Sequence, residues 1–260
     1  MTNNLDALCT LRTKLEESEA SIGGWLQFGN SDIAELMSSS KLFDWMVVDL
    51  EHGALALNEL RNLCRAIEAG YSIPLARVPE STNVWSKIAL EAGCAGVIFP
   101  NISNSMQLSA LIAEAKWPPG GDRGVGFSRS NLYGEDFFDY LEFAQNPLII
   151  AMIESKEAVK NISEIVGVRG LDAILVGPYD LSASVGTPGN FESVEFIDSL
   201  QAICSVCASV KMPYGIHVVD DDPDALMVRI KEGYTFVAYG MDSMFIRSSL
   251  RALKALKHEI

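Results

Sequence analysis

A repeated alternation of short apolar runs with longer amphipathic segments limits most strongly what this chain can fold into. Eight short runs, rich in β-branched and other apolar residues, predict β-strands. They cover residues 22–28, 45–49, 74–78, 95–100, 148–153, 172–176, 214–218 and 235–239. The segments between them predict helices. These cover residues 58–69, 84–92, 103–116, 156–166, 193–210, 223–231 and 242–257.

The pattern favours one closed barrel. The strands lack in-and-out alternation, as expected for a parallel sheet covered on both faces. Eight strand–helix units in about 250 residues match a (β/α)8 TIM-type barrel better than an open doubly wound sheet, which periodicity alone leaves possible. A helix extending to about Glu19 precedes the barrel, and no Pro/Ser/Gly-rich linker divides the chain. We therefore expect a single α/β domain over residues 1–260.

One connection, residues 117–146 after the fourth strand, is much longer than the others and rich in glycine and aromatic residues. A long βα loop belongs to the face where barrels hold their active sites. We therefore expect a lid or substrate-contacting loop here. A surface elaboration packed on its own aromatic side chains is the alternative.

Composition restricts the class of partner. A net charge of −14 argues against binding to nucleic-acid backbones and anionic membranes. A small anionic substrate stays compatible with this charge if local cations or a metal ion offset it. Five scattered cysteines and an N-terminus without a basic or hydrophobic leader indicate a reducing cytoplasm. No lysine ends a predicted strand, and no glycine-rich phosphate loop follows one.

Ionisable residues follow several predicted strands. Strand two ends in Asp49-Leu50-Glu51-His52, strand three in Arg77 and strand five in Glu154. Strand six is followed by Gly177-Pro178-Tyr179-Asp180, and strand seven carries His217. In a parallel barrel these strand ends converge on one pocket.

Glu154 and Asp180 follow adjacent strands. Two close carboxylates repel each other unless a cation lies between them, and oxygen ligands suit Mg²⁺, Mn²⁺ or a similar hard ion. We expect these two residues to bind a metal; helix capping is the alternative for each.

His52 and Arg77 are the other candidates. His52 lies in a tight acidic turn, where a carboxylate neighbour could set its tautomer, so we favour a catalytic role over a structural one. Arg77 is suited to bind a carboxylate or an enolate oxygen, with an ion pair to Glu51 or Glu80 as the alternative. His217, after an apolar strand, is expected to be structural.

Six blocks, VDLEHGAL, LARVPE, KIALEAGCAGVIFPNI, RGVGF, MIESKEAVKN and VGPYDLSASVG, are similar in order and spacing to those of the HpcH/HpaI-type metal-dependent 2-keto-acid aldolases. The resemblance extends from about Gly24 to Leu253. It implies a closed barrel, and a homo-hexamer (trimer of dimers) with an exchanged C-terminal helix.

The resemblance also implies roles for single residues. Glu154 and Asp180 resemble the metal ligands, His52 the acid/base histidine, and Arg77 the arginine that contacts the keto-acid oxygen. Asp49 resembles the carboxylate that helps to order metal-bound water. The segment Gly177-Pro178-Tyr179-Asp180 resembles the one whose backbone amides hold the pyruvate carboxylate.

Four positions bear on the substrate. Glu91 stands where the family often has an aspartate paired with the histidine, so it is a catalytic candidate. Met152 replaces a common glutamine and cannot donate a hydrogen bond, and Tyr179 replaces a common alanine. Phe127 opens the loop segment 127–133, which is expected to help select the aldehyde, either alone or together with a neighbouring subunit.

The implied activity is that of a class II aldolase. It cleaves a 4-hydroxy-2-oxo acid reversibly to pyruvate, or a close analogue, and an aldehyde. Mg²⁺, Mn²⁺ or Co²⁺ acts as a Lewis acid that stabilises an enolate. Two alternatives remain: an acyl-CoA lyase of the citramalyl or malyl type, and a barrel that binds a keto acid without turnover.

Overall fold

The computed structural model describes residues 2–53 and 55–257, and eight parallel strands close into a barrel in chain order. The strands are β1 (Ser21–Leu26), β2 (Trp45–Asp49), β3 (Ile73–Arg77), β4 (Gly96–Phe99), β5 (Leu148–Ile153), β6 (Ala173–Val176), β7 (Tyr214–Val218) and β8 (Phe236–Tyr239). The predicted (β/α)8 barrel is therefore confirmed, and the open sheet is excluded because β1 pairs with both β2 and β8.

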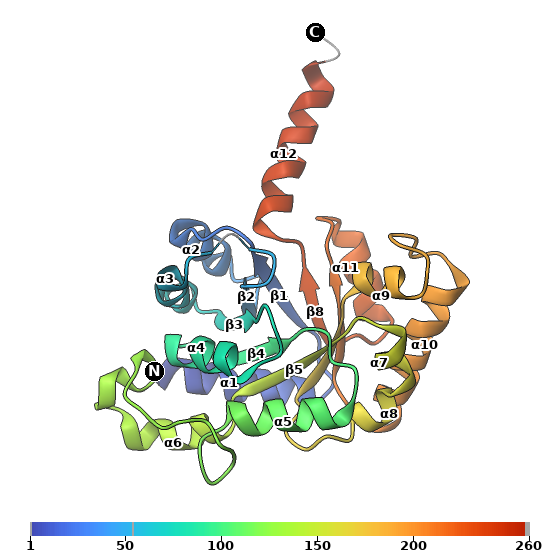
Figure 1. Cartoon of the computed structure of the whole chain (residues 1–260). Helices are drawn as coiled ribbons and strands as arrows, with labels where there is room; N and C mark the ends of the chain where they lie inside the picture. Colours follow the sequence, from blue (N-terminus) through green and yellow to red (C-terminus); the bar gives the residue numbers. More distant parts are fainter. Residues whose placement is uncertain (1, 54, 258–260) are drawn as a thin grey trace.

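Helices surround the barrel (Figure 1). They are α1 (Thr2–Glu16), α2 (Ser31–Ser39), α3 (Leu57–Ala69), α4 (Asn83–Ala92), α5 (Ser105–Ala115), α6 (Phe137–Gln145), α7 (Lys156–Lys160), α8 (Ile162–Ile165), α9 (Pro178–Ser184), α10 (Val194–Ser209), α11 (Pro223–Lys231) and α12 (Asp242–Lys257), with a 3-10 segment η1 (Arg129–Gly134). No helix among the described residues is both long and apolar enough to cross a membrane.

Two apolar cores explain why the strands show no alternation. Trp45 and Val47 of β2 join a core that fills the barrel, whereas Met46 and Val48 join a core between the strands and the helices. Both faces of the strand are thus buried, as expected for parallel strands. The first of these cores also includes apolar side chains of α1, and α1 contacts β1 and β3.

The prediction from sequence omits helices α2, α6 and α9 and joins α7 and α8 into one. Helix α2 begins after Asn30, whose side chain accepts a hydrogen bond from the backbone N–H of Ile33 at 3.0 Å, a standard N-cap. Helices α6 and α9 are short, and their periodicity is weak over so few residues. The predicted helix over 156–166 is two helices, α7 and α8, which meet at Asn161.

The long connection over 117–146 lies elsewhere than expected. It follows helix α5 and precedes strand β5, so it is an αβ connection, and the prediction of a βα loop on the active-site face is wrong. Arg129 anchors it to the carbonyl oxygen of Ala92, at the end of α4, and to Glu68, near the end of α3. Trp117 packs edge-on against Tyr140 of α6. The alternative, a surface elaboration packed on its own aromatics, describes this segment better.

Helix α12 departs from the barrel. Figure 1 shows it projecting from the end of β8 away from the other helices. Its side chains at Ile246, Leu250 and Leu253 are exposed. The spacing of four and three residues places these three on one face of the helix. In the part of the chain that the structure describes, this apolar stripe is therefore exposed.

Candidate active site

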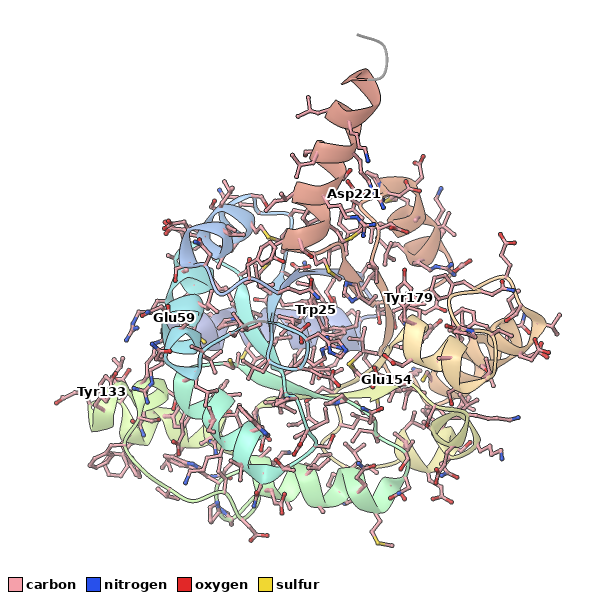
Figure 2. The ribbon with its side chains drawn as sticks, turned by 45° about the horizontal axis from the view of Figure 1, so that its top comes forward. Trp25, Glu59, Tyr133, Glu154, Tyr179 and Asp221 are labelled. Carbon is pink, nitrogen blue, oxygen red and sulfur yellow. The ribbon has the colours of Figure 1, made fainter. Side chains whose placement is uncertain are left out.

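One pocket of about 330 Å³ gathers most of the predicted site residues at the carboxyl ends of the strands. The predicted residues that line it are Asp49, His52, Arg77, Met152, Glu154, Gly177, Pro178, Tyr179 and Asp180. In Figure 2, Trp25, Glu154 and Tyr179 lie near one another at the centre of the molecule, whereas Glu59 and Tyr133 lie at its side. The structure thus brings these nine positions together, while their roles stay predictions.

Arg77 is fixed by two carboxylates. Its Nε and Nη2 donate to Oδ1 and Oδ2 of Asp49 at 3.0 and 2.6 Å, and its Nη1 lies 3.0 Å from Oε2 of Glu51. Burial alone would raise the pKa of Asp49, but the hydrogen bonds and charge of Arg77 outweigh burial and lower it. Asp49 is therefore ionised, and the guanidinium is held in one orientation.

Two aromatic rings support this pair. Trp25 donates from Nε1 to Asp49 Oδ2 at 3.1 Å, and the Arg77 guanidinium lies 5.0 Å from the Trp25 ring centroid. The second ring, His217, stacks on Trp25 with 4.6 Å between the ring centroids, and its Nε2 lies 3.1 Å from the carbonyl oxygen of Gly240. Burial lowers the pKa of His217 to about 4, so the ring is neutral at pH 7. Its expected structural role agrees with these contacts.

Glu154 is a buried carboxylate directly after β5. Its Oε2 accepts a hydrogen bond from the backbone N–H of Asn101 at 2.8 Å. Asn101 follows β4 with a φ of 54°, a left-handed conformation that asparagine tolerates and that turns this N–H toward the site. The pKa of Glu154 is raised to about 7, chiefly by burial and also by the charges of Asp180 and Glu51, while the Asn101 hydrogen bond opposes the rise.

Asp180 and His52 lie at the open side of the same pocket. Asp180 is in the first turn of α9 and is exposed, as is His52. The backbone N–H of His52 donates to Asp49 Oδ1 at 3.1 Å, so the acidic turn after β2 is closed by the same carboxylate that holds Arg77. His52 and Arg77 thus line the same pocket, and the side chain of His52 is exposed at its open side.

The carboxylates of this pocket suit a hard divalent cation. Glu154 and Asp180 both line the pocket, and the negative charge of Asp180 contributes to raising the pKa of Glu154. Glu51 is paired with Arg77, since its Oε2 lies 3.0 Å from Arg77 Nη1. Like charges held this close are stabilised by a cation between them. Residues 2–53 and 55–257 contain no group of three or more His, Cys, Asp or Glu side chains arranged to hold a metal ion. Two protein carboxylates would leave the remaining positions to substrate and water.

Gly177 sets the distance between the two candidate ligands. A Cβ at this position would lie 2.5 Å from Glu154 Oε1 and 2.8 Å from its Cγ. The turn from β6 to α9 can therefore run against the Glu154 side chain only because residue 177 lacks a side chain. Pro178 then begins α9, at a position where its missing N–H costs nothing.

Two predicted site residues lie away from the pocket. Glu91 is in the last turn of α4, where its carboxylate lies 3.8 Å from Lys87 Nζ, so the expected pairing with His52 does not occur within one chain. Phe127 lies in the αβ connection, edge-on to Phe137 at 5.8 Å, and is 73% exposed. Phe127 is not among the residues that line the pocket of its own chain, because an αβ connection emerges at the other end of the barrel. Its expected contact with the aldehyde together with a neighbouring subunit stays a prediction.

Two contributors to the site are missed by sequence reasoning: Trp25 donates to Asp49, and the Asn101 backbone N–H donates to Glu154. Glu51 was named as an alternative ion-pair partner of Arg77, and that ion pair is present. Trp25 carries no signal in the sequence, because an aromatic residue in an apolar strand is usually read as core.

Comparisons with known proteins agree over nearly the whole chain. The family model described as HpcH/HpaI aldolase/citrate lyase matches residues 22–249. A 2-dehydro-3,6-dideoxy-6-sulfogluconate aldolase of Pseudomonas putida is 31% identical over 246 residues, covering 94% of this chain and 95% of that protein. A 4-hydroxy-2-oxo-heptane-1,7-dioate aldolase of Salmonella paratyphi A is 32% identical, covering 93% and 91%.

Solved structures match as well. An HpcH/HpaI aldolase/citrate lyase family protein of Burkholderia cenocepacia J2315 has a TM-score of 0.88 at 27% identity, covering 95% of this chain and 99% of that one. The shared fold and the shared sequence thus extend over the barrel and its flanking helices, and the resemblance drawn from the six sequence blocks is confirmed.

Proposed function

The chain belongs to the HpcH/HpaI aldolase/citrate lyase family, and from this premise we propose that it is a divalent-metal-dependent aldolase acting on 4-hydroxy-2-oxo acids. It cleaves them reversibly to pyruvate, or a close analogue, and an aldehyde. The relatives named as aldolases support this reaction class. The observation that carries the proposal is the convergence of Glu154, Asp180, Arg77 and His52 on one pocket.

Glu154 and Asp180 would hold the metal ion, for which Mg²⁺, Mn²⁺ and Co²⁺ are the candidates. When bound, such an ion supplies a Lewis acid that stabilises negative charge on the keto oxygen of the substrate. The hydrogen bond from the Asn101 N–H to Glu154 and the location of Asp180 in the first turn of α9 support this assignment.

Arg77 supplies the fixed positive charge of the site. Asp49 and Glu51 hold its guanidinium, so it needs no rearrangement when negative charge develops on the substrate oxygen. His52 would take the proton of the C4 hydroxyl as the carbon–carbon bond breaks, and would return it in the aldol direction. Amides of the segment Gly177-Pro178-Tyr179-Asp180 would bind the substrate carboxylate at the start of α9.

Substituting the two carboxylates tests the proposal. Glu154→Gln and Asp180→Asn should each abolish pyruvate formation from a 4-hydroxy-2-oxo acid, while Glu157→Gln, an exposed glutamate of α7, should retain it. EDTA should stop turnover, and added Mg²⁺, Mn²⁺ or Co²⁺ should restore it to different extents. Metal-dependent turnover that survived both substitutions would contradict the assignment.

Exchange of the pyruvate methyl protons for deuterium separates an enzyme from a barrel that only binds keto acids. We expect wild-type protein with metal to catalyse the exchange, followed by proton NMR. No exchange above the rate of free metal would favour the non-catalytic alternative.

We also propose that one domain acts within a cytoplasmic homo-hexamer arranged as a trimer of dimers. The apolar stripe of Ile246, Leu250 and Leu253 on the projecting α12 supports assembly with further copies of the chain. The five free cysteines support a reducing compartment.

A further inference from the structure

A second hollow adjoins the candidate active site. This side pocket, of about 160 Å³, shares Pro178, Tyr179, His217 and Val219 with the site pocket. An apolar cavity of about 150 Å³ is large enough to take a benzene molecule. A substrate seated at Glu154 and Arg77 could therefore extend into this space without leaving the protein.

The lining of the side pocket is largely hydrocarbon. Phe196 and Ile216 are buried there, and the rings of Phe191 and Phe196 lie 5.3 Å apart. Tyr179 stands edge-on to Phe191 at 5.1 Å and lies between the two hollows, because it lines both. Such a surface stabilises an apolar substituent by roughly 25 cal/mol for each Å² removed from water.

Carboxylates at the rim of the side pocket repel negatively charged groups. Asp220 and Asp222 are exposed carboxylates of this rim. Arg229 is the cation among its lining residues, and its Nη1 lies 2.7 Å from Glu232 Oε2, which offsets its charge. A substituent that ended in a carboxylate would thus meet like charge, with one already paired cation to receive it.

We propose that the side pocket binds the carbon chain of an uncharged, apolar aldehyde of up to about six carbons, with Tyr179 as the specificity-determining residue beside the reacting centre. This proposal rests on the aldolase function proposed above and narrows it to one class of aldehyde. Among the described residues that line the pocket, Arg229 is the one cation that could receive a negatively charged tail, and one of its nitrogen atoms is already paired with Glu232.

Filling the side pocket tests the proposal. Ala225 of α11 lines it, and Ala225→Leu adds three carbons there. Ala110→Leu, on the exposed surface of α5, is the matched control. We would measure kcat/KM for acetaldehyde, hexanal and succinic semialdehyde in aldol addition to pyruvate. The hexanal-to-acetaldehyde ratio should fall about tenfold in Ala225→Leu and less than twofold in the control, since one methylene in an apolar pocket changes discrimination by about 10–200-fold.

Wild-type protein should also prefer hexanal to succinic semialdehyde. Tyr179→Ala provides a second variant that removes a wall instead of adding bulk, and it should lower the same ratio. Equal ratios in Ala225→Leu and Ala110→Leu, or a preference for succinic semialdehyde in the wild type, would overturn the proposal.

Binding without turnover separates the two proposals. Saturation-transfer NMR with 1-hexanol should show contact with wild-type and Ala110→Leu protein and a clear loss in Ala225→Leu. If no aldehyde reacts with pyruvate, the aldolase proposal fails while the hexanol result still decides the side pocket. If aldol turnover occurs but hexanol binds all three proteins equally, the side pocket proposal alone fails.

Discussion

At the scale of single residues, the chemistry of the site depends on how firmly Arg77 is held. Three of its nitrogen atoms face carboxylate oxygens, and its guanidinium lies over an indole ring. The planar guanidinium of arginine can donate hydrogen bonds to Asp49 and Glu51 at the same time, whereas the ammonium group of a lysine is a compact point charge. The position therefore requires arginine and not simply a cation.

Arg77→Lys should lower kcat for aldol cleavage by about 10²–10³-fold, because the positive charge is no longer fixed beside the developing oxyanion. Steady-state kinetics with saturating metal would measure this effect. Arg61→Lys, on the exposed face of α3, serves as the control and should leave kcat unchanged. A fall of less than tenfold would mean that the orientation of Arg77 contributes little to the chemical step.

His217 should make stability depend on pH. Burial lowers its pKa from 6.5 to about 4, so between these values the unfolded chain binds a proton that the folded chain does not. The free energy of unfolding should therefore decrease as the pH falls through this window, by about 2 kcal/mol between pH 7.5 and 5. Urea unfolding of wild type and His217→Gln would show it: the variant should lose this part of the slope.

His52→Gln is the matched control for this titration, because His52 is exposed and the substitution should keep the wild-type slope. An equal pH dependence in wild type and His217→Gln would show that folding does not lower the pKa of this ring, contrary to its buried stacking on Trp25.

The strand-end residues could be predicted from the sequence, because parallel strands of a closed barrel must bring their carboxyl ends together. Glu154, Asp180, Arg77 and His52 follow from that rule alone. Whether Glu91 contacts His52 could not be predicted from the sequence, since this depends on the direction in which α4 presents its last turn. The hydrogen bond from Trp25 to Asp49 could not be predicted either, because it joins residues of two different strands and no sequence pattern marks it.

At the scale of elements, the turn between β6 and α9 sets the geometry of the candidate metal site. Gly177→Ala should weaken metal binding strongly while the fold survives, because the added methyl group would meet the end of the Glu154 side chain at 2.5 Å. Isothermal titration with Mn²⁺ would give the affinity, and thermal unfolding the stability.

Gly167→Ala is the control for this turn, since a Cβ there has no contact closer than 3.5 Å. It should keep the wild-type affinity for Mn²⁺. Unchanged affinity in Gly177→Ala would show that Glu154 can move aside, and that its present position is not required for binding.

The long αβ connection shows where element-level prediction from sequence stops. Its length and its aromatic content were evident, but the end of the barrel at which it emerges depends on whether a helix precedes it. A helix over 103–116 is predictable from the sequence, and α5 confirms it, so the order of elements alone assigns this connection to the αβ end of the barrel. Glycine and aromatic content does not distinguish the two ends.

At the scale of the whole molecule, α12 is the element that a single chain leaves uncovered. Leu250→Asp should shift the protein toward smaller species in sedimentation velocity, because it places a charge within the apolar stripe. Ser249→Asp adds the same charge at an exposed position beside the stripe and should leave assembly intact. Identical sedimentation of both variants and the wild type would exclude a role of this stripe in assembly.

The position of Trp25 should make the intrinsic fluorescence of the protein sensitive to binding at the site. The chain has four tryptophans, and Trp25 lines the site pocket, where it is hydrogen-bonded to Asp49 and stacked on His217. Its indole emission should therefore respond when a metal ion or a keto acid enters, whereas Trp45 and Trp117 lie in the apolar core that fills the barrel. A fluorescence titration of unlabelled protein could then follow each binding step, and Trp25→Phe would identify the signal as coming from the site.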